Sequence, residues 1–154
     1  MADLPFDRIE ENPPFTYTGM DVFGPFLITD GVNTRRSSAT KKTWALVMTC
    51  LVTRAIHVEP LPYLDTNACK NALRRFFAIR GTCKRLRSDC GTNFIGVKNQ
   101  EENNVSLNDI IKEVEIHGCE WILNPPKASH FGGVWERKSA SIRRILDAAL
   151  LQLG

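Results

Sequence analysis

The sequence predicts a single α/β domain in which helices pack on a mixed five-stranded sheet. Short runs of β-branched, aromatic and other apolar residues end at glycine or proline, and they alternate with runs whose apolar residues recur at helical spacing. Taken in chain order, these runs predict the elements β-β-β-α-β-α-β-α. The 154 residues, 43% hydrophobic and 24% charged, suffice for one domain with a buried core. Residues 1–14 carry three prolines and several acids, so we expect an extended lead-in to a domain spanning 15–154.

Three strands are predicted to open the domain. They cover residues 16–23, 43–51 and 55–59. The first is expected to stop at Gly24-Pro25, and the polar run 33–42 is expected to be an exposed connection. The second run is nearly all apolar, which indicates burial on both faces. The third forms a hairpin with it and is expected to end before Pro60.

Two helices and two further strands follow. The first helix is predicted over 65–81, with Asp65 as its N-cap and Gly81 as its stop. Its apolar residues share one face: Cys69, Ala72, Leu73, Phe76 and Phe77. A weaker helix is expected over 105–116, and strands are expected over 84–89 and 120–124.

The last predicted helix follows a loop that contains Pro125-Pro126 and Gly132-Gly133. At 100° per residue, one stripe of this helix is apolar and is expected to face the core. The stripe holds Trp135, Ser139, Ile142, Leu146, Ala149, Leu150 and Leu153, and the opposite face holds Arg137, Ser141, Arg144 and Gln152. Glu136 lies on the border between the two. Considered alone, Glu136 is interpreted as an acid in the first turn of the helix, where a negative charge interacts favourably with the helix dipole.

Several functional classes find no support in the composition. No apolar run reaches the roughly 18 residues that a membrane span requires, and the N-terminus lacks the pattern of a signal peptide, so we expect a soluble intracellular protein. The five cysteines are scattered without zinc-ligand spacing, and we expect Cys50, Cys69 and Cys119 to be small core residues. A net charge of +3 is only mildly basic and does not by itself establish binding to a polyanion.

Three acids stand out by position: Asp21 within the first strand, Asp89 at the end of the fourth, and Glu136 at the start of the last helix. Singly, each is more often a cap, a turn residue or a surface charge. Together they match the needs of polynucleotidyl transfer, in which two divalent ions about 3.5 to 4 Å apart are held by carboxylates. Magnesium prefers such oxygen ligands.

Four segments together resemble the catalytic core of retroviral-type integrases, and more narrowly integrases of BEL/Pao LTR retrotransposons. They are Phe15 to Phe26, Leu73 to Phe77, Ser88 to Phe94 and Pro125 to Arg137. The sequence departs from the family pattern at Cys90, where asparagine is usual, and at Ser129, where proline is common. Neither change removes a metal ligand.

The resemblance implies a ribonuclease-H-like fold and a catalytic triad of Asp21, Asp89 and Glu136. It implies two Mg²⁺ or Mn²⁺ ions that activate water for trimming the element's DNA ends, and then the 3′-hydroxyl for joining them to target DNA. Basic and polar side chains near the triad are expected to contact phosphates; the candidates are Asn93, Lys127, His130, Arg137 and Lys138. A homodimer, with higher oligomers in the full-length protein, is the expected assembly. Action on host DNA implies the nucleus, after passage through cytoplasmic virus-like particles.

Two other functions remain open on the sequence alone. One is a domesticated, catalytically silent integrase fold that binds DNA or protein, which the absence of triad carboxylates would favour. The other is a ribonuclease H, which would use the same fold and metals. Arg85 and Arg87 share strand parity with Asp89, so they are expected either to neutralise the acidic site or to meet DNA.

Overall fold

The computed structural model describes residues 11–29, 40–89 and 107–124, together with residues 137, 140–142, 144, 145 and 148. Its elements are β1 (Tyr17–Thr29), β2 (Thr40–Cys50), β3 (Ile56–Leu61), α1 (Thr66–Arg80), β4 (Arg85–Asp89), α3 (Leu107–Ile116) and β5 (Glu120–Asn124). Residues 137, 140–142, 144, 145 and 148 are also helical, and we call them the C-terminal helical segment.

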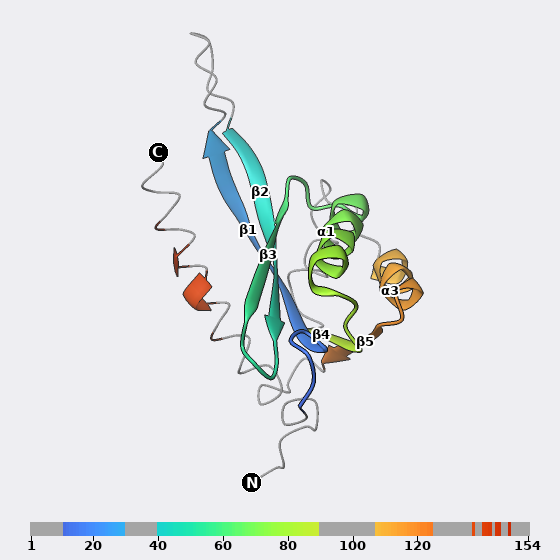
Figure 1. The fold of residues 1–154 in the computed structure, drawn as a ribbon. Helices are drawn as coiled ribbons and strands as arrows, with labels where there is room; N and C mark the ends of the chain where they lie inside the picture. The colour runs from blue at the N-terminus through green and yellow to red at the C-terminus, as the bar shows by residue number, and fades with distance from the viewer. Residues whose placement is uncertain are drawn as a thin grey trace.

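The strands form one five-stranded sheet in the order β3-β2-β1-β4-β5. The pairs β1/β2 and β2/β3 are antiparallel, whereas β1/β4 and β4/β5 are parallel. Figure 1 shows α1 and α3 on one side of the sheet and the C-terminal helical segment, in red, on the other. The prediction of a mixed five-stranded sheet flanked by helices is therefore confirmed.

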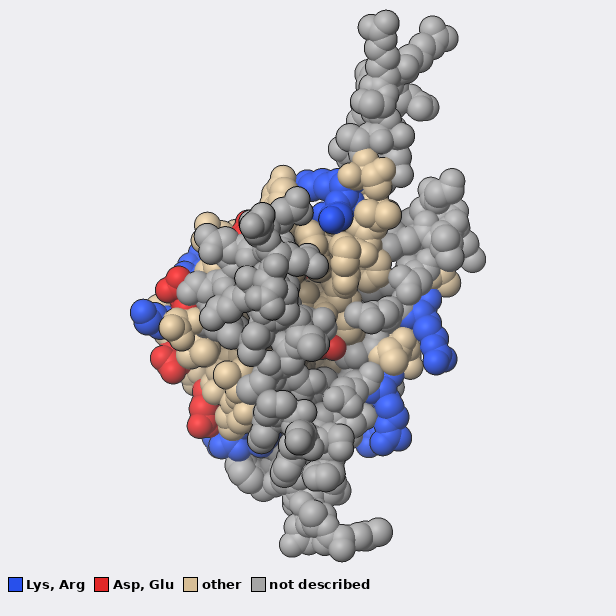
Figure 2. All heavy atoms as spheres, turned by 180° about the vertical axis from the view of Figure 1, so that it is seen from behind, with Lys and Arg blue, Asp and Glu red and all other residues tan. Residues whose placement is uncertain are grey.

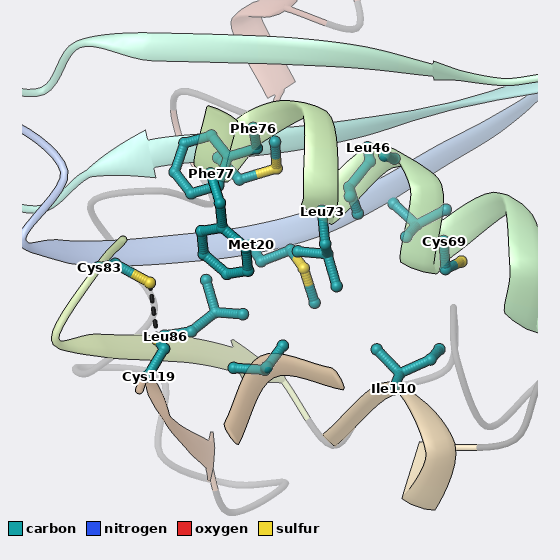
Figure 3. Close-up of a cluster of buried hydrophobic side chains, with 14 of the residues drawn as sticks. Met20, Leu46, Cys69, Leu73, Phe76, Phe77, Cys83, Leu86, Ile110 and Cys119 are labelled. Carbon is teal, nitrogen blue, oxygen red and sulfur yellow. Dashed lines mark hydrogen bonds between the residues drawn. The ribbon is translucent and has the colours of Figure 1, made fainter. Parts of the chain in front are cut away.

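The main hydrophobic core lies between the sheet and the two helices α1 and α3. Met20 of β1 and Leu46 of β2 point towards α1, whose Leu73 and Phe76 are fully buried against them (Figure 3). Ile110 closes the same core from α3. Because side chains alternate along a strand, the residue between Met20 and Val22 belongs to the other face of the sheet. We call the side covered by α1 and α3 the core face, and the other the open face.

Helix α1 begins and ends where the sequence predicts. The Asp65 carboxylate accepts a hydrogen bond from the backbone N–H of Ala68 at 2.7 Å, as an N-cap should. At the other end, Gly81 has φ +83° and donates its N–H to the Phe77 carbonyl at 2.9 Å. These two caps fix the length of the helix that covers the core.

Within the described residues, no helix is long and apolar enough to cross a membrane.

Strand β1 does not stop at Gly24-Pro25, so that prediction is wrong. Pairing with β2 breaks between Phe23 and Phe26, and then resumes up to Thr29. Two β1 residues lie opposite the single residue Trp44, which is a β-bulge. The bulge accommodates a proline that has no N–H to donate, and it lets the strand continue beyond it.

Gly24 is expected to be intolerant of any side chain. It has φ +137°, and a β-carbon at this position would lie 2.5 Å from Cδ1 of Trp44. We expect Gly24→Ala to lower the free energy of unfolding by about 2 to 3 kcal/mol, measured by urea denaturation. The matched control is Gly118→Ala, where φ is +76° but the space is open. An equal loss in both variants would assign the cost to backbone conformation alone and contradict the clash with Trp44.

Two other strand boundaries also differ from the prediction. Strand β2 starts at Thr40, so the end of the run expected to be an exposed connection belongs to a strand; residues 33–39 lie outside the described residues. Strand β3 continues through Pro60 to Leu61. Proline is tolerated there because β3 is an edge strand, so the missing N–H removes no bond on its outer side.

The prediction that Cys50, Cys69 and Cys119 are small core residues is confirmed, since all three are buried. Cys83 is buried as well, and its thiol lies 2.7 Å from that of Cys119 (Figure 3). This thiol-thiol hydrogen bond raises the pKa of Cys83, as does burial. Burial and the nearby Asp65 carboxylate raise the pKa of Cys69 to about 12. Cys69 and Cys83 therefore pack as neutral thiols.

Candidate functional site

Asp21 lies in β1, which is the central strand of the sheet. Its neighbours Met20 and Val22 are buried in the core, so Asp21 occupies an open-face position. The residue is half-buried, and its Oδ1 accepts a hydrogen bond from the Val22 N–H at 2.8 Å. This bond restrains the carboxylate at the middle of the open face.

The strand register aligns Asp21 with Asp89. The parallel pairing of β1 with β4 runs from Tyr17 opposite Arg85 to Met20 opposite Ser88. The next position in this register sets the backbone of Asp21 alongside that of Asp89, and neighbouring strands lie about 4.8 Å apart. Two acids that are distant in sequence are therefore adjacent in the sheet.

The end of β4 also lies beside the end of β5. Asp89 pairs with Asn124, and both strands end at these residues. In sheets of this kind, ligands commonly bind beyond the carboxyl ends of parallel strands. Asn124 is thus a third polar residue in the row of Asp21 and Asp89. It was not among the predicted site residues, and its signal in the sequence is an asparagine that ends a strand before Pro-Pro.

The C-terminal helical segment packs on the open face beside Asp21. Ile142 is buried and forms a small apolar cluster with Phe23 of β1 and Val47 of β2. Val47 is also the β2 residue that pairs with Asp21. The predicted stripe is confirmed where it is described, because Ile142 is buried whereas Arg137, Ser141 and Arg144 are exposed.

Most of the other predicted site residues lie outside the described residues. These are Glu136, Asn93, Lys127, His130 and Lys138, as well as the side chain of Asp89 and the two departures from the family pattern, Cys90 and Ser129. Arg137 is described: it is exposed and helical, and its carbonyl accepts a hydrogen bond from Ser141 Oγ at 3.1 Å. The structure thus sets the backbones of Asp21 and Asp89 on neighbouring strands, and Glu136 lies outside the described residues.

Arg85 and Arg87 share the open face with the acids, since both alternate with the buried residues Leu86 and Ser88. Arg85 donates from Nε to the Glu120 carboxylate of β5 at 3.2 Å. Its charge is therefore directed towards β5. Arg87 is half-buried and pairs in register with Gly19, one open-face position before Asp21.

The donors in this row suit a hard divalent cation, because carboxylate and amide oxygens are the ligands that Mg²⁺ prefers. Among the side chains that the structure describes, no three His, Cys, Asp or Glu residues gather as a complete metal site.

No protein-family model and no curated protein matches the sequence. The structure is nevertheless similar to solved integrase structures. One is the intasome of simian T-cell lymphotropic virus in complex with PP2A regulatory subunit B56 gamma, with a TM-score of 0.61 and 10% identity, covering 91% of this chain and 42% of that chain. This chain thus spans less than half the length of the matched chain.

Two further similar structures are of the HTLV-2 integrase catalytic core domain in complex with magnesium. The trimeric form has a TM-score of 0.57 and the dimeric form 0.58, each at 14% identity and covering 91% of this chain. The chain covers 74% and 75% of those cores. At such low identity, the likeness establishes the fold. The chain therefore has the ribonuclease-H-like fold of retroviral integrase catalytic cores.

Proposed function

We propose that this chain is the catalytic core of a metal-dependent DNA integrase, of the type found in BEL/Pao LTR retrotransposons. The observation that carries the proposal is the parallel register of β1 and β4, which aligns Asp21 with Asp89. The similarity to an HTLV-2 core solved with magnesium supports it. So does the helical segment that packs on the same face, since Glu136 directly precedes its first described residue.

Asp21, Asp89 and Glu136 would hold two Mg²⁺ or Mn²⁺ ions. Bound there, the ions would supply charge stabilisation to both the attacking and the leaving oxygen of a phosphodiester. The sheet contributes rigidity, because the backbones of the two aspartates are fixed by strand pairing rather than by a loop. Glu136, which directly precedes the C-terminal helical segment in the sequence, would supply the third carboxylate.

The protein's remaining task is to position DNA. In end trimming the nucleophile is water, and in end joining it is the 3′-hydroxyl of the element's DNA. Neither step needs a covalent enzyme intermediate, so no serine or cysteine nucleophile is required. Phosphate contacts are assigned to basic and polar residues close in sequence to Asp89 or Glu136, namely Asn93, Lys127, His130, Arg137 and Lys138.

The proposal is tested by a Mn²⁺-dependent strand-transfer or disintegration assay on branched DNA. The parent chain is compared with Glu136→Gln and Asp89→Asn, which keep side-chain size and remove one charge each. We expect activity in the parent and a loss of at least about a thousandfold in each variant. Equal activity in all three proteins would contradict the proposal that this chain catalyses the reaction through these acids. Tight DNA binding with no activity in any of them would support a silent DNA-binding fold instead.

Dimerisation through α1 is part of the same proposal. The chain resembles integrase cores in this helix, and the similar HTLV-2 structures are dimeric and trimeric forms. Ile79, near the end of α1, is 64% exposed and offers apolar surface.

A further inference from the structure

Beyond the bulge, β1 and β2 continue as a two-stranded arm. The arm consists of Phe26–Thr29 of β1 paired with Thr40–Thr43 of β2. Figure 1 shows it extending past the end of α1, away from the rest of the sheet. An isolated two-stranded ribbon buries little apolar surface and adds little to the stability of the fold. A contribution to stability therefore does not explain why the fold includes this arm.

The surface of the arm is basic and apolar. Lys41 and Lys42 are exposed, and they pair with Ile28 and Leu27, which are 40% and 64% exposed. Among the described residues, neither lysine forms an ion pair with an acid. Figure 2 shows basic side chains, in blue, beside the tan atoms at the upper edge of the described surface. In the sequence, residues 26–43 contain four basic residues and one acid, Asp30. This stretch of the chain is therefore net basic.

Lys41 is oriented by an aromatic side chain from another part of the chain. Its ammonium group lies 4.5 Å from the centroid of the Tyr63 ring and donates to the Tyr63 hydroxyl at 3.4 Å. A cation held over an aromatic ring loses less conformational entropy when it meets a ligand than a free lysine does. This contact leaves the lysine exposed to solvent.

Lys41 and the candidate site share one face of the sheet, whereas Lys42 alternates to the other face. Lys41 and Val47 have the same parity on β2, which has no bulge of its own, and Val47 pairs with Asp21. Six residues of extended strand separate their backbones by about 20 Å. Successive nucleotides of one DNA strand rise by about 3.4 Å, so this span corresponds to roughly six base pairs.

From these observations we infer that the arm is a second DNA-binding site. It binds the phosphate backbone about six base pairs from the phosphodiester that would react beside Asp21. Lys41 binds a phosphate, and the exposed Ile28, which pairs with it on the same face, contacts the neighbouring sugar. The inference rests on the proposed function for the identity of the ligand. It assigns the arm a positioning role, because the arm contacts DNA away from the reacting atoms.

The first test measures binding of a fluorescein-labelled DNA duplex by anisotropy across a series of salt concentrations. We expect Lys41→Ala to bind several-fold more weakly, and its salt slope to fall by about one, because one phosphate is no longer neutralised by lysine. The control is Lys112→Ala, which removes an exposed lysine from α3 on the core face. Unchanged affinity and slope in Lys41→Ala, or no binding by the parent, would overturn the inference.

The second test locates the contact. Lys41→p-benzoylphenylalanine is irradiated on branched DNA, and crosslinks are expected to cluster about six nucleotides from the scissile phosphate. Crosslinks spread evenly, or formed with a second copy of the chain, would contradict a DNA-binding arm. The outcome is separable from the proposed function. If the salt slope depends on the arm but cleavage does not depend on Glu136, DNA binding by the arm is supported and the proposed enzyme function is wrong. If cleavage depends on Glu136 but the salt slope does not depend on the arm, the enzyme function is supported and DNA binding by the arm is wrong.

Discussion

Asp21→Asn is expected to abolish Mn²⁺-dependent DNA cleavage and joining, by at least about a thousandfold, while the fold is retained. Asparagine has the same size as aspartate, and its amide oxygen can still accept the hydrogen bond from the Val22 N–H. The change therefore removes one charge and little else. A strand-transfer assay on branched DNA measures the effect.

The same substitution is expected to have an opposite effect on metal-free stability. The register sets two carboxylate-bearing residues side by side on β1 and β4. Like charges directly opposite one another in a sheet are destabilising, so Asp21→Asn should raise the free energy of unfolding without metal by up to about 1 kcal/mol. Because a bound ion stabilises only the folded state, the parent should gain melting temperature in Mn²⁺. The variant should lose that gain.

The combination of lost activity, higher metal-free stability and a lost response to Mn²⁺ distinguishes a metal ligand from a structural aspartate. The control is Asp109→Asn, which makes the same chemical change at an exposed position in the first turn of α3. It should leave activity and the Mn²⁺-induced rise in melting temperature as they are in the parent. If Asp21→Asn destabilised the metal-free chain and kept the response to Mn²⁺, the carboxylate would be structural and the proposed site would be wrong.

The element order of the fold could be predicted from the sequence because the relevant signals are local. Asp65 and Gly81 bracket α1, since capping depends only on neighbouring residues. The end of β1 could not be predicted in this way. Gly24-Pro25 is a stop signal by composition, and only its pairing with β2 opposite Trp44 makes it a bulge. Pro60 lies within β3 for a similar reason, because a proline there is tolerated only if β3 is an edge strand.

The candidate site shows the same division between local and long-range information. The sequence singles out Asp21 and Asp89 as acids in strands, but their adjacency depends on the pairing of β1 with β4 across 68 residues of chain. Asn124 joins that row only through β5. Strand pairing of this range is set by the packing of the whole sheet, which no local pattern reports.

A buried polar network between β3 and α1 likewise has no local signal in the sequence. His57 and Glu59 lie on the core face and are only 8% and 5% exposed. His57 Nε2 lies 2.7 Å from one Glu59 oxygen, and Arg75 Nε donates to the other at 2.6 Å. Arg80 Nε donates to His57 Nδ1 at 3.1 Å, so this nitrogen is an acceptor and the ring hydrogen lies on Nε2, facing Glu59. The network ties the last two turns of α1 to the edge strand.

Glu59→Ala is the stability change from which we expect the largest effect. It removes the acceptor for both His57 and Arg75 and leaves the buried Nε2–H of His57 without a partner. A buried donor left unsatisfied costs about 1 to 3 kcal/mol, and the loss of the charge-assisted bond to Arg75 adds to this. We expect a total loss of about 2 to 4 kcal/mol by urea denaturation. Glu113→Ala is the comparison: Glu113 is also buried but its partners Arg74 and His117 are more exposed, so water can replace it and the loss should be smaller.

The pH dependence of stability gives the network a second signature. Burial raises the pKa of Glu59, but the hydrogen bonds from Arg75 and His57 outweigh it, and the net pKa is lowered. A lowered carboxylate pKa stabilises the fold above the unfolded value of about 4.3, and that stabilisation disappears as pH falls through the folded value. Stability of the parent should therefore decline below about pH 5, and Glu59→Gln should flatten this decline. Glu115→Gln, an exposed change on α3, should keep the parental slope. An equally steep decline in Glu59→Gln would mean that the ionised Glu59 contributes nothing to the docking of α1.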